Sequence, residues 1–590
     1  MCGIIGFVGE EQAAPIILSS LENLEYRGYD SAGIATISDG KICLKKDVGH
    51  LEEVQQKHHL DELPGVLGIG HVRWATHGGV TANNAHPHLD CSGNIAVVHN
   101  GIIENYRELR SRLKSKHNFI SQTDTEVIPH LLEDYLNDGA SLEEGVIRVT
   151  KQLQGSYAFV AIYSREPGKI VAARQGNSLI VGLADGRKFI ASDSLSFLKM
   201  TDQAIFVEDG EIVVATKDKV RFFNQDSLEL EKSPGKIDWK WDEATKQGYD
   251  SFTLKEILEE PETARRALMQ DKNLVMDMAL GILRARQVVF IGCGTSRYAA
   301  LLGRYVFSKF GGGFSPVIIA SEYPYFSESI DSNTLVMAVS QSGETADILE
   351  AVRAAKRKSA TIFSIVNRVD SSLARMSNKV LYLNCGPEIG VVATKSFVAQ
   401  LIIFYLLGFA IGNKLDEGLD KLAAAPSWIA GNHRENGKGL IKLAWKLRKR
   451  KDFYYIARGT NFHIAGEAAL KLKEIAYVHA DGMPAGELKH GSLALIEKGT
   501  PVIAICPEDY TFHETLSNVE EAKARGAFVI GVSDRREDVF DKWIKIPKVE
   551  EIFYPLVSIV PLQLFAYHSA IARGLDPDKP RNLAKSVTVK

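Results

Sequence analysis

The second residue of the chain is a cysteine, in the opening run MCGIIG. A small residue at this position favours removal of Met1, which would leave Cys2 with a free thiol and a free α-amine. An amine with a pKa of about 8 can take the thiol proton, and sulfur remains a good nucleophile at neutral pH. One residue would then supply both a nucleophile and a base. Taken alone, the run also fits a buried cysteine on an apolar strand.

Four other residues of the first third could hold an amino acid. Arg73, in GHVRWATHGG, could bind a carboxylate through two hydrogen bonds, and Asp124, in TDTE, could accept from an ammonium group. Asn100 and the backbone N–H of Gly101 could stabilise an oxyanion. Simpler interpretations are a surface ion pair for Arg73, a helix cap for Asp124 and a turn for Asn100-Gly101.

Acid–base residues gather near the carboxyl end. Glu467, Lys471 and Glu474 follow helical spacing, so they project from one face of a helix. A solvated ladder of ion pairs usually explains such spacing, but the apolar neighbours of these residues indicate that the charged face lines a site. His490, in GELKHG, could move protons near neutral pH.

The elements that carry the first set of residues are short strands and helices. Helices are expected at about 10–24, 106–116 and 124–137. Asp-Gly pairs between apolar alternating runs predict hairpins at 39–40, 185–186 and 209–210. Together they predict an antiparallel α+β domain at 1–225, followed by a charged connector at 226–250.

Beyond the connector the chain repeats itself. VVFIGCGTS (288–296) matches FYYIARGTN (453–461), and further pairs follow at nearly the same offset. They are LVMAVS (335–340) with VIAIC (502–506), IFSIVNR (362–368) with FVIGVSDR (528–535), and Gln400 with Gln563. Apolar strands that alternate with helices predict two doubly wound parallel α/β domains, at 251–425 and 426–575, and a tail at 576–590.

The two α/β domains differ in the loop after the second of their matching strands. The first carries SQSGET (340–345), whose hydroxyl and amide groups at a helix start suit a phosphate. Thr295 and Ser296 would face the same crevice at the carboxyl edge of the sheet. The second carries Pro507-Glu508-Asp509, so we expect one phosphate site. A capped helix start is the alternative for SQSGET.

Five motifs of the first domain occur together and in order. They are MCGIIG (1–6), LEYRGYDSAGIA (24–35), HVRWATHG (71–78), HNGIIENY (99–106) and TDTE (123–126). They resemble the glutaminase domain of amidotransferases with an amino-terminal cysteine nucleophile, which implies a four-layer αββα fold of the Ntn-hydrolase type. By this resemblance Cys2 attacks the glutamine amide and releases ammonia. Arg73 and Asp124 would bind glutamine, Asn100 and Gly101 would form the oxyanion hole, and Trp74 and His77 would lie in the closing loop.

Six motifs of the remainder point to a second resemblance. CGTS, SQSGET, EIGVVATK (388–395), EAALKLKEIAY (467–477), AGELKHG (485–491) and RNLAKSVTV (581–589) resemble the paired sugar-isomerase (SIS) domains of the glutamine:fructose-6-phosphate aminotransferase family. The resemblance implies that ammonia crosses an internal channel to fructose 6-phosphate, which is isomerised to glucosamine 6-phosphate, the first step of amino-sugar synthesis. The expected sugar-phosphate ligands are Thr295, Ser296, Ser340, Gln341, Ser342, Thr345, Val391 and Ala584.

The same resemblance implies roles for the acid–base residues. His490, from the partner in a homodimer, would open the sugar ring, Lys585 would form an imine with the ketone, and Glu474 would move the proton between carbons 1 and 2. Glu467 and Lys471 would support the site, and Trp74 would gate the channel. No metal or organic cofactor is expected. Ala393 and Ser492 depart from the residues common in the family, Ser and Pro.

Composition excludes several classes of partner. Seventy Lys and Arg residues nearly balance 73 Asp and Glu residues, so no basic field favours nucleic acid or an anionic membrane. The six cysteines show no CxxC spacing, which predicts a reduced, cytoplasmic protein without a zinc site. The longest apolar run, 401–412, is too short to span a bilayer, and no basic segment marks the amino terminus for export.

Two other function classes fit part of the pattern. A glutaminase that feeds a phosphoribosyl acceptor would need an acidic pair in a Gly/Thr-rich turn after a strand, and the sequence has none. A regulator that senses a sugar phosphate would need SQSGET but neither Cys2 nor Lys585. A related synthase that acts on another sugar remains an open alternative, because a phosphate loop does not identify the whole substrate.

Overall fold

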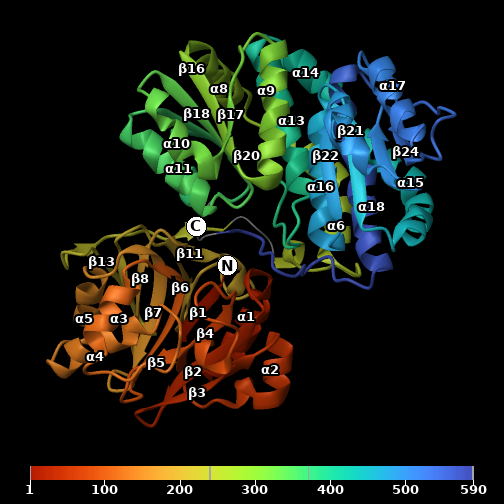
Figure 1. Ribbon diagram of the computed structural model, residues 1–590. Coiled ribbons are helices and arrows are strands. Elements are labelled where there is room, and N and C mark those ends of the chain that lie inside the picture. Colours follow the sequence, from red (N-terminus) through yellow and green to blue (C-terminus); the bar gives the residue numbers. More distant parts are fainter. Residues whose placement is uncertain (1, 238–240, 370, 588–590) are drawn as a thin grey trace. The chain divides into compact units, whose positions relative to one another are not determined.

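The computed structural model describes residues 2–237, 241–369 and 371–587 (Figure 1). The backbone divides into two compact units. The amino-terminal unit comprises Met1–Ala244 with Ala584–Lys590, and the carboxyl-terminal unit comprises Thr245–Leu583. The first unit includes most of the expected connector, because β15 (Gly235–Lys236) pairs with β11 (Gln203–Phe206).

Two antiparallel sheets form the centre of the amino-terminal unit. The first has the order β15-β11-β9-β10-β1-β4-β2-β3, where the strands not yet given are β9 Ile180–Ala184, β10 Arg187–Ala191, β1 Gly3–Val8, β4 Leu67–Arg73, β2 Ser31–Ser38 and β3 Lys41–Val48. The second has the order β14-β13-β12-β8-β7-β6-β5, with β14 Glu229–Leu230, β13 Val220–Phe223, β12 Ile212–Ala215, β8 Ile170–Gln175, β7 Gly155–Tyr163, β6 Ile95–Ile103 and β5 His88–Leu89.

Helices cover the outer face of each sheet, which gives the four layers that the sequence predicts (Figure 1). They are α1 Ala13–Glu22 and α2 Leu51–His58 on the first sheet, and α3 Tyr106–Leu113, α4 Val127–Asn137 and α5 Leu142–Thr150 on the second. Strand β1 shows how the layers separate: Ile5 and Phe7 pack toward α1, whereas Ile4 and Val8 pack between the sheets.

Two of the three predicted Asp-Gly hairpins are present. Asp39-Gly40 joins the paired strands β2 and β3, and Asp185-Gly186 joins β9 and β10. The prediction at Asp209-Gly210 was wrong, because β11 and β12 belong to different sheets. This turn carries the chain from the first sheet to the second. The Asp209 carboxylate stabilises it by accepting from the backbone N–H of Gly176 at 2.7 Å.

The carboxyl-terminal unit contains two five-stranded parallel sheets. The first has the order β17-β16-β18-β19-β20, with β17 Val317–Ile319, β16 Gln287–Gly292, β18 Thr334–Ser340, β19 Thr361–Val366 and β20 Lys379–Tyr382. The second has the order β22-β21-β23-β24-β25, with β22 His479–Pro484, β21 Asp452–Ala457, β23 Pro501–Ile505, β24 Phe528–Ser533 and β25 Lys542–Lys545. The sequence repeat is therefore a repeat of this strand order.

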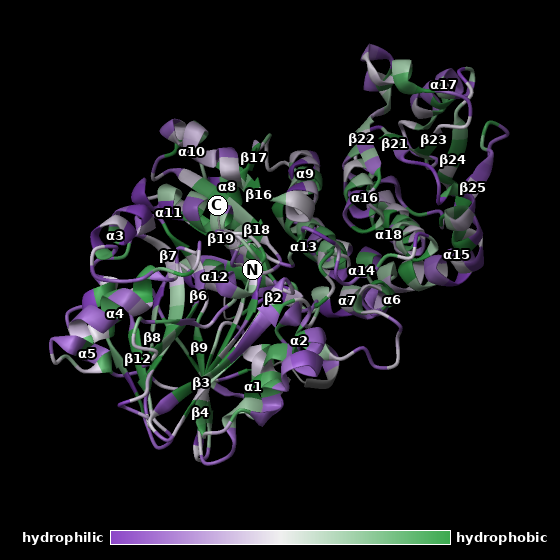
Figure 2. Cartoon of the chain, turned by 60° about the horizontal axis from the view of Figure 1, so that its bottom comes forward, coloured by the Kyte–Doolittle hydropathy of each residue, from purple (hydrophilic) through white to green (hydrophobic). Residues whose placement is uncertain are grey.

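Helices surround both sheets. Those of the first half are α6 Phe252–Leu258, α7 Glu260–Ala267, α8 Lys272–Arg284, α9 Gly294–Lys309, α10 Tyr323–Phe326, α11 Ala346–Arg357, α12 Ser372–Met376, α13 Lys395–Ile411 and α14 Leu415–Leu422. Those of the second half are α15 Ala425–Leu447, α16 Asn461–Ala476, α17 Phe512–Lys523 and α18 Tyr554–Ala572. Figure 2 shows β16 and β18 as hydrophobic, while the outer helix α1 alternates between polar and apolar residues.

Helices α13 and α18 are the most apolar of the unit. Every residue of α13 is buried, as expected for the 401–412 run. The span Glu551–Ala572, which includes α18, is the one described helix that is long and apolar enough to cross a membrane, yet 89% of its apolar 18-residue stretch is buried inside the fold. It packs against α15 and α16, which identifies it as a core helix.

Candidate active site

The thiol of Cys2 lies at the end of the space between the two antiparallel sheets. It donates to the carbonyl of Trp74 at 3.4 Å and accepts from the Trp74 backbone N–H at 3.2 Å. Burial raises the pKa of Cys2, whereas the Trp74 N–H and the charges of Arg73 and Arg27 lower it. Loss of the thiol proton therefore needs a base close by.

A pocket opens at this sulfur. Its lining residues are Cys2, Arg73, Trp74, Thr76, His77, His86, His99, Gly101, Thr123, Asp124 and Thr125. The structure thus brings together six of the predicted glutamine-site residues from four separate motifs. Strand pleating explains part of this arrangement: Arg73 shares a face of β4 with Leu67 and Ile69, which both pack between the sheets.

The guanidinium of Arg73 holds the loop that follows β4. It donates to the carbonyls of His77 at 2.6 Å, Gly78 at 3.2 Å and Gly79 at 3.2 Å. The ring of His77 packs edge-on against Tyr106, with 5.5 Å between centroids. Arg73 therefore shapes the loop in addition to lining the pocket.

On the opposite wall, Asp124 and Gly101 are held by backbone contacts. The Asp124 carboxylate is buried and accepts from the N–H of Ile103 at 2.8 Å. Gly101 has a φ of +116°, and a Cβ added there would lie 2.0 Å from the carbonyl oxygen of Ser156. Only glycine fits at this position without displacing β7.

Asn100 lies beside the pocket. Its Nδ2 donates to the carbonyl of Cys2 at 3.0 Å, and its Oδ1 contacts Nε2 of His71 at 3.1 Å. In this arrangement the Asn100 amide orients the backbone of the nucleophile. It is next to Gly101, whose N–H is the other expected oxyanion donor.

Sequence reasoning missed three residues, Arg27, Asp30 and Asp193, that hold the backbone around Cys2 and the pocket loop. Arg27 is buried, pairs with Asp193 at 3.1 Å and donates to the Cys2 carbonyl at 3.0 Å. Asp30 accepts from the N–H of Ala75 at 2.8 Å, which fixes the start of the pocket loop. Arg27 and Asp30 lie in LEYRGYDSAGIA, so the motif was visible in the sequence but the contacts of its charged residues were not.

Six of the eight residues predicted to bind the sugar phosphate lie in the carboxyl-terminal unit, at the carboxyl ends of adjacent strands. Thr295 and Ser296 follow β16, and the 340–345 loop begins where the neighbouring β18 ends. Within the loop, Ser340 Oγ accepts from the Gly343 N–H at 3.0 Å and lies 3.5 Å from Thr345 Oγ1. Gln341 is half-buried, and Ser342 Oγ accepts from the Glu344 N–H at 3.2 Å.

The acid–base helix is α16, and its charged face is buried against α9. Lys471 Nζ lies 3.3 Å from Glu467, 2.7 Å from Glu474 and 2.8 Å from Thr295 Oγ1. Thr295 also donates to Glu467 at 3.0 Å. The expected charged face is therefore joined directly to a predicted phosphate ligand of the other half.

Burial sets the protonation of this network. Desolvation and the charge of Glu474 raise the pKa of Glu467 to about 7, although Lys471 and Thr295 lower it. Burial alone would lower the pKa of Lys471, but the charges of Glu467 and Glu474 raise it above its usual range. A carboxyl group that titrates near neutral pH inside a cluster of polar groups is typical of a functional site.

The remaining predicted residues are more dispersed. His490 is exposed and ends a short 3₁₀ helix, Ala485–His490, rather than lying in an open loop. The buried Val391 donates its N–H to the carbonyl of Asp578 at 3.4 Å. Ala584 and Lys585 are half-buried and belong to the amino-terminal unit by their contacts. Their roles toward the sugar stay predictions.

Known proteins match the chain throughout. The glutamine amidotransferase domain model matches residues 71–199, and the SIS domain model matches 281–410 and 446–573. The glutamine–fructose-6-phosphate aminotransferases (isomerizing) of Methanothermobacter thermautotrophicus and Pyrococcus horikoshii are 48% and 45% identical, each over 100% of both chains. The chain belongs to this family.

A solved structure supports the carboxyl-terminal unit. The C-terminal domain of glucosamine-fructose-6-phosphate aminotransferase from Francisella tularensis covers 57% of this chain and 99% of its own, with 31% identity and a TM-score of 0.53. The predicted family, fold class and enzyme class are thereby confirmed. The two alternative classes, a glutaminase that feeds a phosphoribosyl acceptor and a regulator that senses a sugar phosphate, do not explain a full-length match to aminotransferases.

Proposed function

We propose that the two units catalyse one coupled reaction, in which glutamine and fructose 6-phosphate become glutamate and glucosamine 6-phosphate. The observation that carries this proposal is the pair of sites: a half-buried thiol in a polar pocket, and the Glu467–Lys471–Glu474 network on Thr295. The atoms balance without another reactant, because one water is released when nitrogen replaces the ketone oxygen of the sugar and one water is consumed when the thioester is hydrolysed.

In the glutamine half, the amine of Cys2 takes the thiol proton once Met1 has been removed. The thiolate attacks the side-chain amide, ammonia leaves, and water then releases glutamate from the thioester. Arg73 and Asp124 bind the carboxylate and amine of glutamine, and Asn100 and Gly101 stabilise the oxyanion. Trp74 and His77 lie in the loop after β4, where they close over the substrate.

In the sugar half, the hydroxyl and amide groups of Thr295, Ser296 and the 340–345 loop bind the phosphate, and Val391 and Ala584 contact the sugar. His490 opens the ring, and Lys585 forms an imine with the ketone, which ammonia then displaces. Glu474 moves a proton from carbon 1 to carbon 2. Its contact with Lys471 at 2.7 Å keeps the carboxylate oriented for that transfer, and Glu467 supports Lys471.

The first experiment follows glutamate and glucosamine 6-phosphate together in the Met1-processed enzyme, beside Cys2→Ala and Glu474→Gln variants. Equal yields of the two products are expected from the wild type. Cys2→Ala should make amino sugar only from added ammonium, and Glu474→Gln should release glutamate only. Glutamate without amino sugar in the wild type would favour a synthase for another phosphosugar, and absence of both products would contradict the proposal.

We also propose that ammonia passes between the sites through an internal channel gated by Trp74. Amide-labelled glutamine supplied with excess unlabelled ammonium should then give labelled glucosamine 6-phosphate. Trp74→Ala should lower the labelled fraction while glutamate release continues. Complete dilution of the label in the wild type would show that ammonia equilibrates with solvent.

A homodimer in the cytoplasm completes the proposal, with His490 supplied by the partner. Mixing two inactive variants, His490→Ala and Glu474→Gln, tests this directly. Exchange of subunits would give mixed dimers, which make up about half of all dimers when the two variants are mixed in equal amounts. Each mixed dimer would contain one intact sugar site, so activity would return. No recovery after proven exchange of subunits would place His490 in its own subunit's site.

A further inference from the structure

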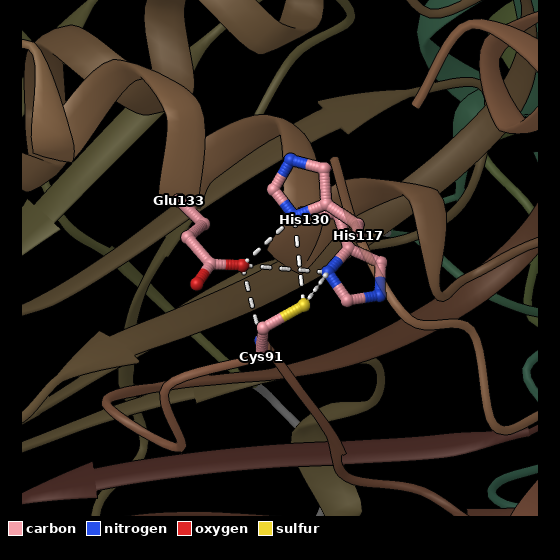
Figure 3. A group of neighbouring side chains, drawn as sticks. All are labelled: Cys91, His117, His130 and Glu133. Carbon is pink, nitrogen blue, oxygen red and sulfur yellow. Dashed lines mark hydrogen bonds and ion pairs between the residues drawn. The ribbon is translucent and has the colours of Figure 1, made fainter. Parts of the chain in front are cut away.

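Four side chains of types that can bind a metal ion meet in the amino-terminal unit (Figure 3). Cys91 lies in the turn between β5 and β6, His117 lies between α3 and α4, and His130 and Glu133 project from one face of α4. None of the four lines the pocket at Cys2. Their spacing in sequence gives no zinc motif, which is why composition alone predicted none.

The distances suit a tetrahedral ion. Cys91 Sγ lies 3.6 Å from His117 Nδ1 and 3.6 Å from His130 Nδ1. Glu133 Oε2 lies 3.0 Å from His117 Nδ1 and 3.5 Å from His130 Nδ1. Zinc bonds of about 2.0 Å to nitrogen or oxygen and about 2.3 Å to sulfur give tetrahedral edges of roughly 3.3–3.6 Å. The four donor atoms all lie within 4.8 Å of one another.

The outer ring nitrogens meet carboxylates. His117 Nε2 lies 3.2 Å from Asp134 Oδ1, and His130 Nε2 lies 3.8 Å from Glu126 Oε1. A carboxylate behind a histidine fixes its tautomer and turns the other nitrogen toward the metal, which is the usual arrangement around protein zinc. Asp134 can act in this way on His117, whereas the 3.8 Å between His130 and Glu126 is longer than a hydrogen bond. Both histidines direct Nδ1 inward, as Figure 3 shows.

The backbone supports the sulfur and the carboxylate. The Asn118 N–H donates to Cys91 Sγ at 3.4 Å, and the Cys91 N–H donates to Glu133 Oε2 at 3.0 Å. Asp90 holds the turn by accepting from the Ile95 N–H at 2.8 Å. His117, His130 and Glu133 have little exposed side-chain surface, so the donors are confined before any ion arrives.

We propose that Cys91, His117, His130 and Glu133 bind one structural Zn²⁺. A thiolate and two imidazoles favour zinc over magnesium or calcium, and four protein donors close the coordination shell, which is typical of structural sites. The ion would join the β5–β6 turn, the α3–α4 connection and α4. The segment before α4 carries Thr123, Asp124 and Thr125 of the Cys2 pocket, so the ion would also stabilise that wall.

The test uses the full chain with a Cys2→Ala substitution, which removes the competing thiol of the pocket. Chelator-treated protein is equilibrated with Zn²⁺, passed through a desalting column and analysed for metal. We expect about one zinc per chain, and Cys43→Ser, a half-buried cysteine outside the cluster, should leave this ratio unchanged. Cys91→Ser and His117→Gln should each weaken zinc binding by at least about 10-fold.

Two further measurements separate zinc binding from misfolding. Co²⁺ should give a thiolate charge-transfer band in the parent protein that is lost in Cys91→Ser, whose substitution at an exposed residue leaves the core intact. Added Zn²⁺ should raise the unfolding temperature of the parent and of Cys43→Ser but not of Cys91→Ser. The proposal would be overturned if the parent protein bound no stoichiometric zinc, or if Cys91→Ser retained as much zinc as the parent. The four side chains would then form only a hydrogen-bonded cluster.

Discussion

The two halves of the carboxyl-terminal unit share a strand order but differ in chemistry. Thr295 in the first half aligns with Thr460 in the second, and the same offset aligns Leu302 with Glu467 and Val306 with Lys471. Leu302 and Val306 are buried among apolar side chains, whereas Glu467 and Lys471 are buried as a charged pair. The same two helix positions therefore hold apolar packing residues in one half and a charged pair in the other.

The loops after β18 and β23 differ in the same way. In the first half, Ser340 and Thr345 provide hydroxyl groups. In the second half, Asp509 accepts from Asn461 Nδ2 at 3.2 Å and from the Thr511 N–H at 2.8 Å, so a carboxylate meets the donors that could otherwise hold an anion. After duplication, each half could lose one function because the other retained it.

The largest effect is expected from removing the central cation. Lys471→Met leaves the buried Glu467 and the half-buried Glu474 without their partner, and breaking a buried ion pair costs about 3–5 kcal/mol. Amino-sugar synthesis should fall by at least about 10²-fold, while glutamate release from Cys2 continues. The matched control is Lys473→Met, an exposed residue of the same helix. If Lys471→Met retained a third of the wild-type rate of amino-sugar synthesis, the Glu467–Lys471–Glu474 network would not be required for catalysis.

Exchanging charge between the two loops tests whether only one half binds phosphate. Gln341→Glu places a like charge in the first loop, and we expect a 10- to 100-fold higher KM for fructose 6-phosphate, about 1.4–2.8 kcal/mol. The mirror change, Glu508→Gln on the exposed second loop, should leave KM unchanged. A similar KM change in both variants would contradict the assignment of a single phosphate site.

The buried carboxyl of Glu467 predicts that the stability of the fold depends on pH. Leu302, the aligned residue of the first half, does not titrate and cannot give this effect. The Glu467 pKa of about 7 exceeds the unfolded value of about 4.5, so the folded state binds more protons between these values. The free energy of unfolding should therefore fall as pH rises from about 4.5 to about 7, by about 1–3 kcal/mol. Glu467→Gln should remove this part of the slope.

Chemical unfolding of wild type and Glu467→Gln at each pH measures that difference. Glu260, whose pKa burial also raises to about 7, contributes equally to both proteins and cancels. Identical slopes would mean that Lys471 keeps Glu467 ionised throughout this range.

The smallest effect is expected at Asp509. Asp509→Asn keeps an oxygen to accept from Thr511, so a loss of about 1 kcal/mol in the free energy of unfolding and no change in the KM for fructose 6-phosphate are expected. Urea unfolding and steady-state kinetics on one preparation give both values. A KM that changes by more than threefold would show that the second loop takes part in sugar binding.

Motifs with strong local geometry were predictable. The Asp-Gly hairpins at 39–40 and 185–186 and the repeated parallel sheets follow from turn chemistry and hydrophobic pattern, which act within a few residues. Asp209-Gly210 has the same local signal, yet its neighbours pair with strands in two different sheets. Which partner a strand takes depends on the whole fold, and one sequence window does not contain that information.

Sequence alone determined the family, the duplication and the candidate residues of both sites, because each of these is carried by contiguous motifs. Only the tertiary structure decided which distant side chains meet. Arg27 reaches the Cys2 carbonyl, Thr295 joins Lys471 across two halves, and Cys91 meets His117, His130 and Glu133. These contacts depend on strand pairing and helix packing between segments far apart in the chain, which fix side-chain positions that no local spacing encodes.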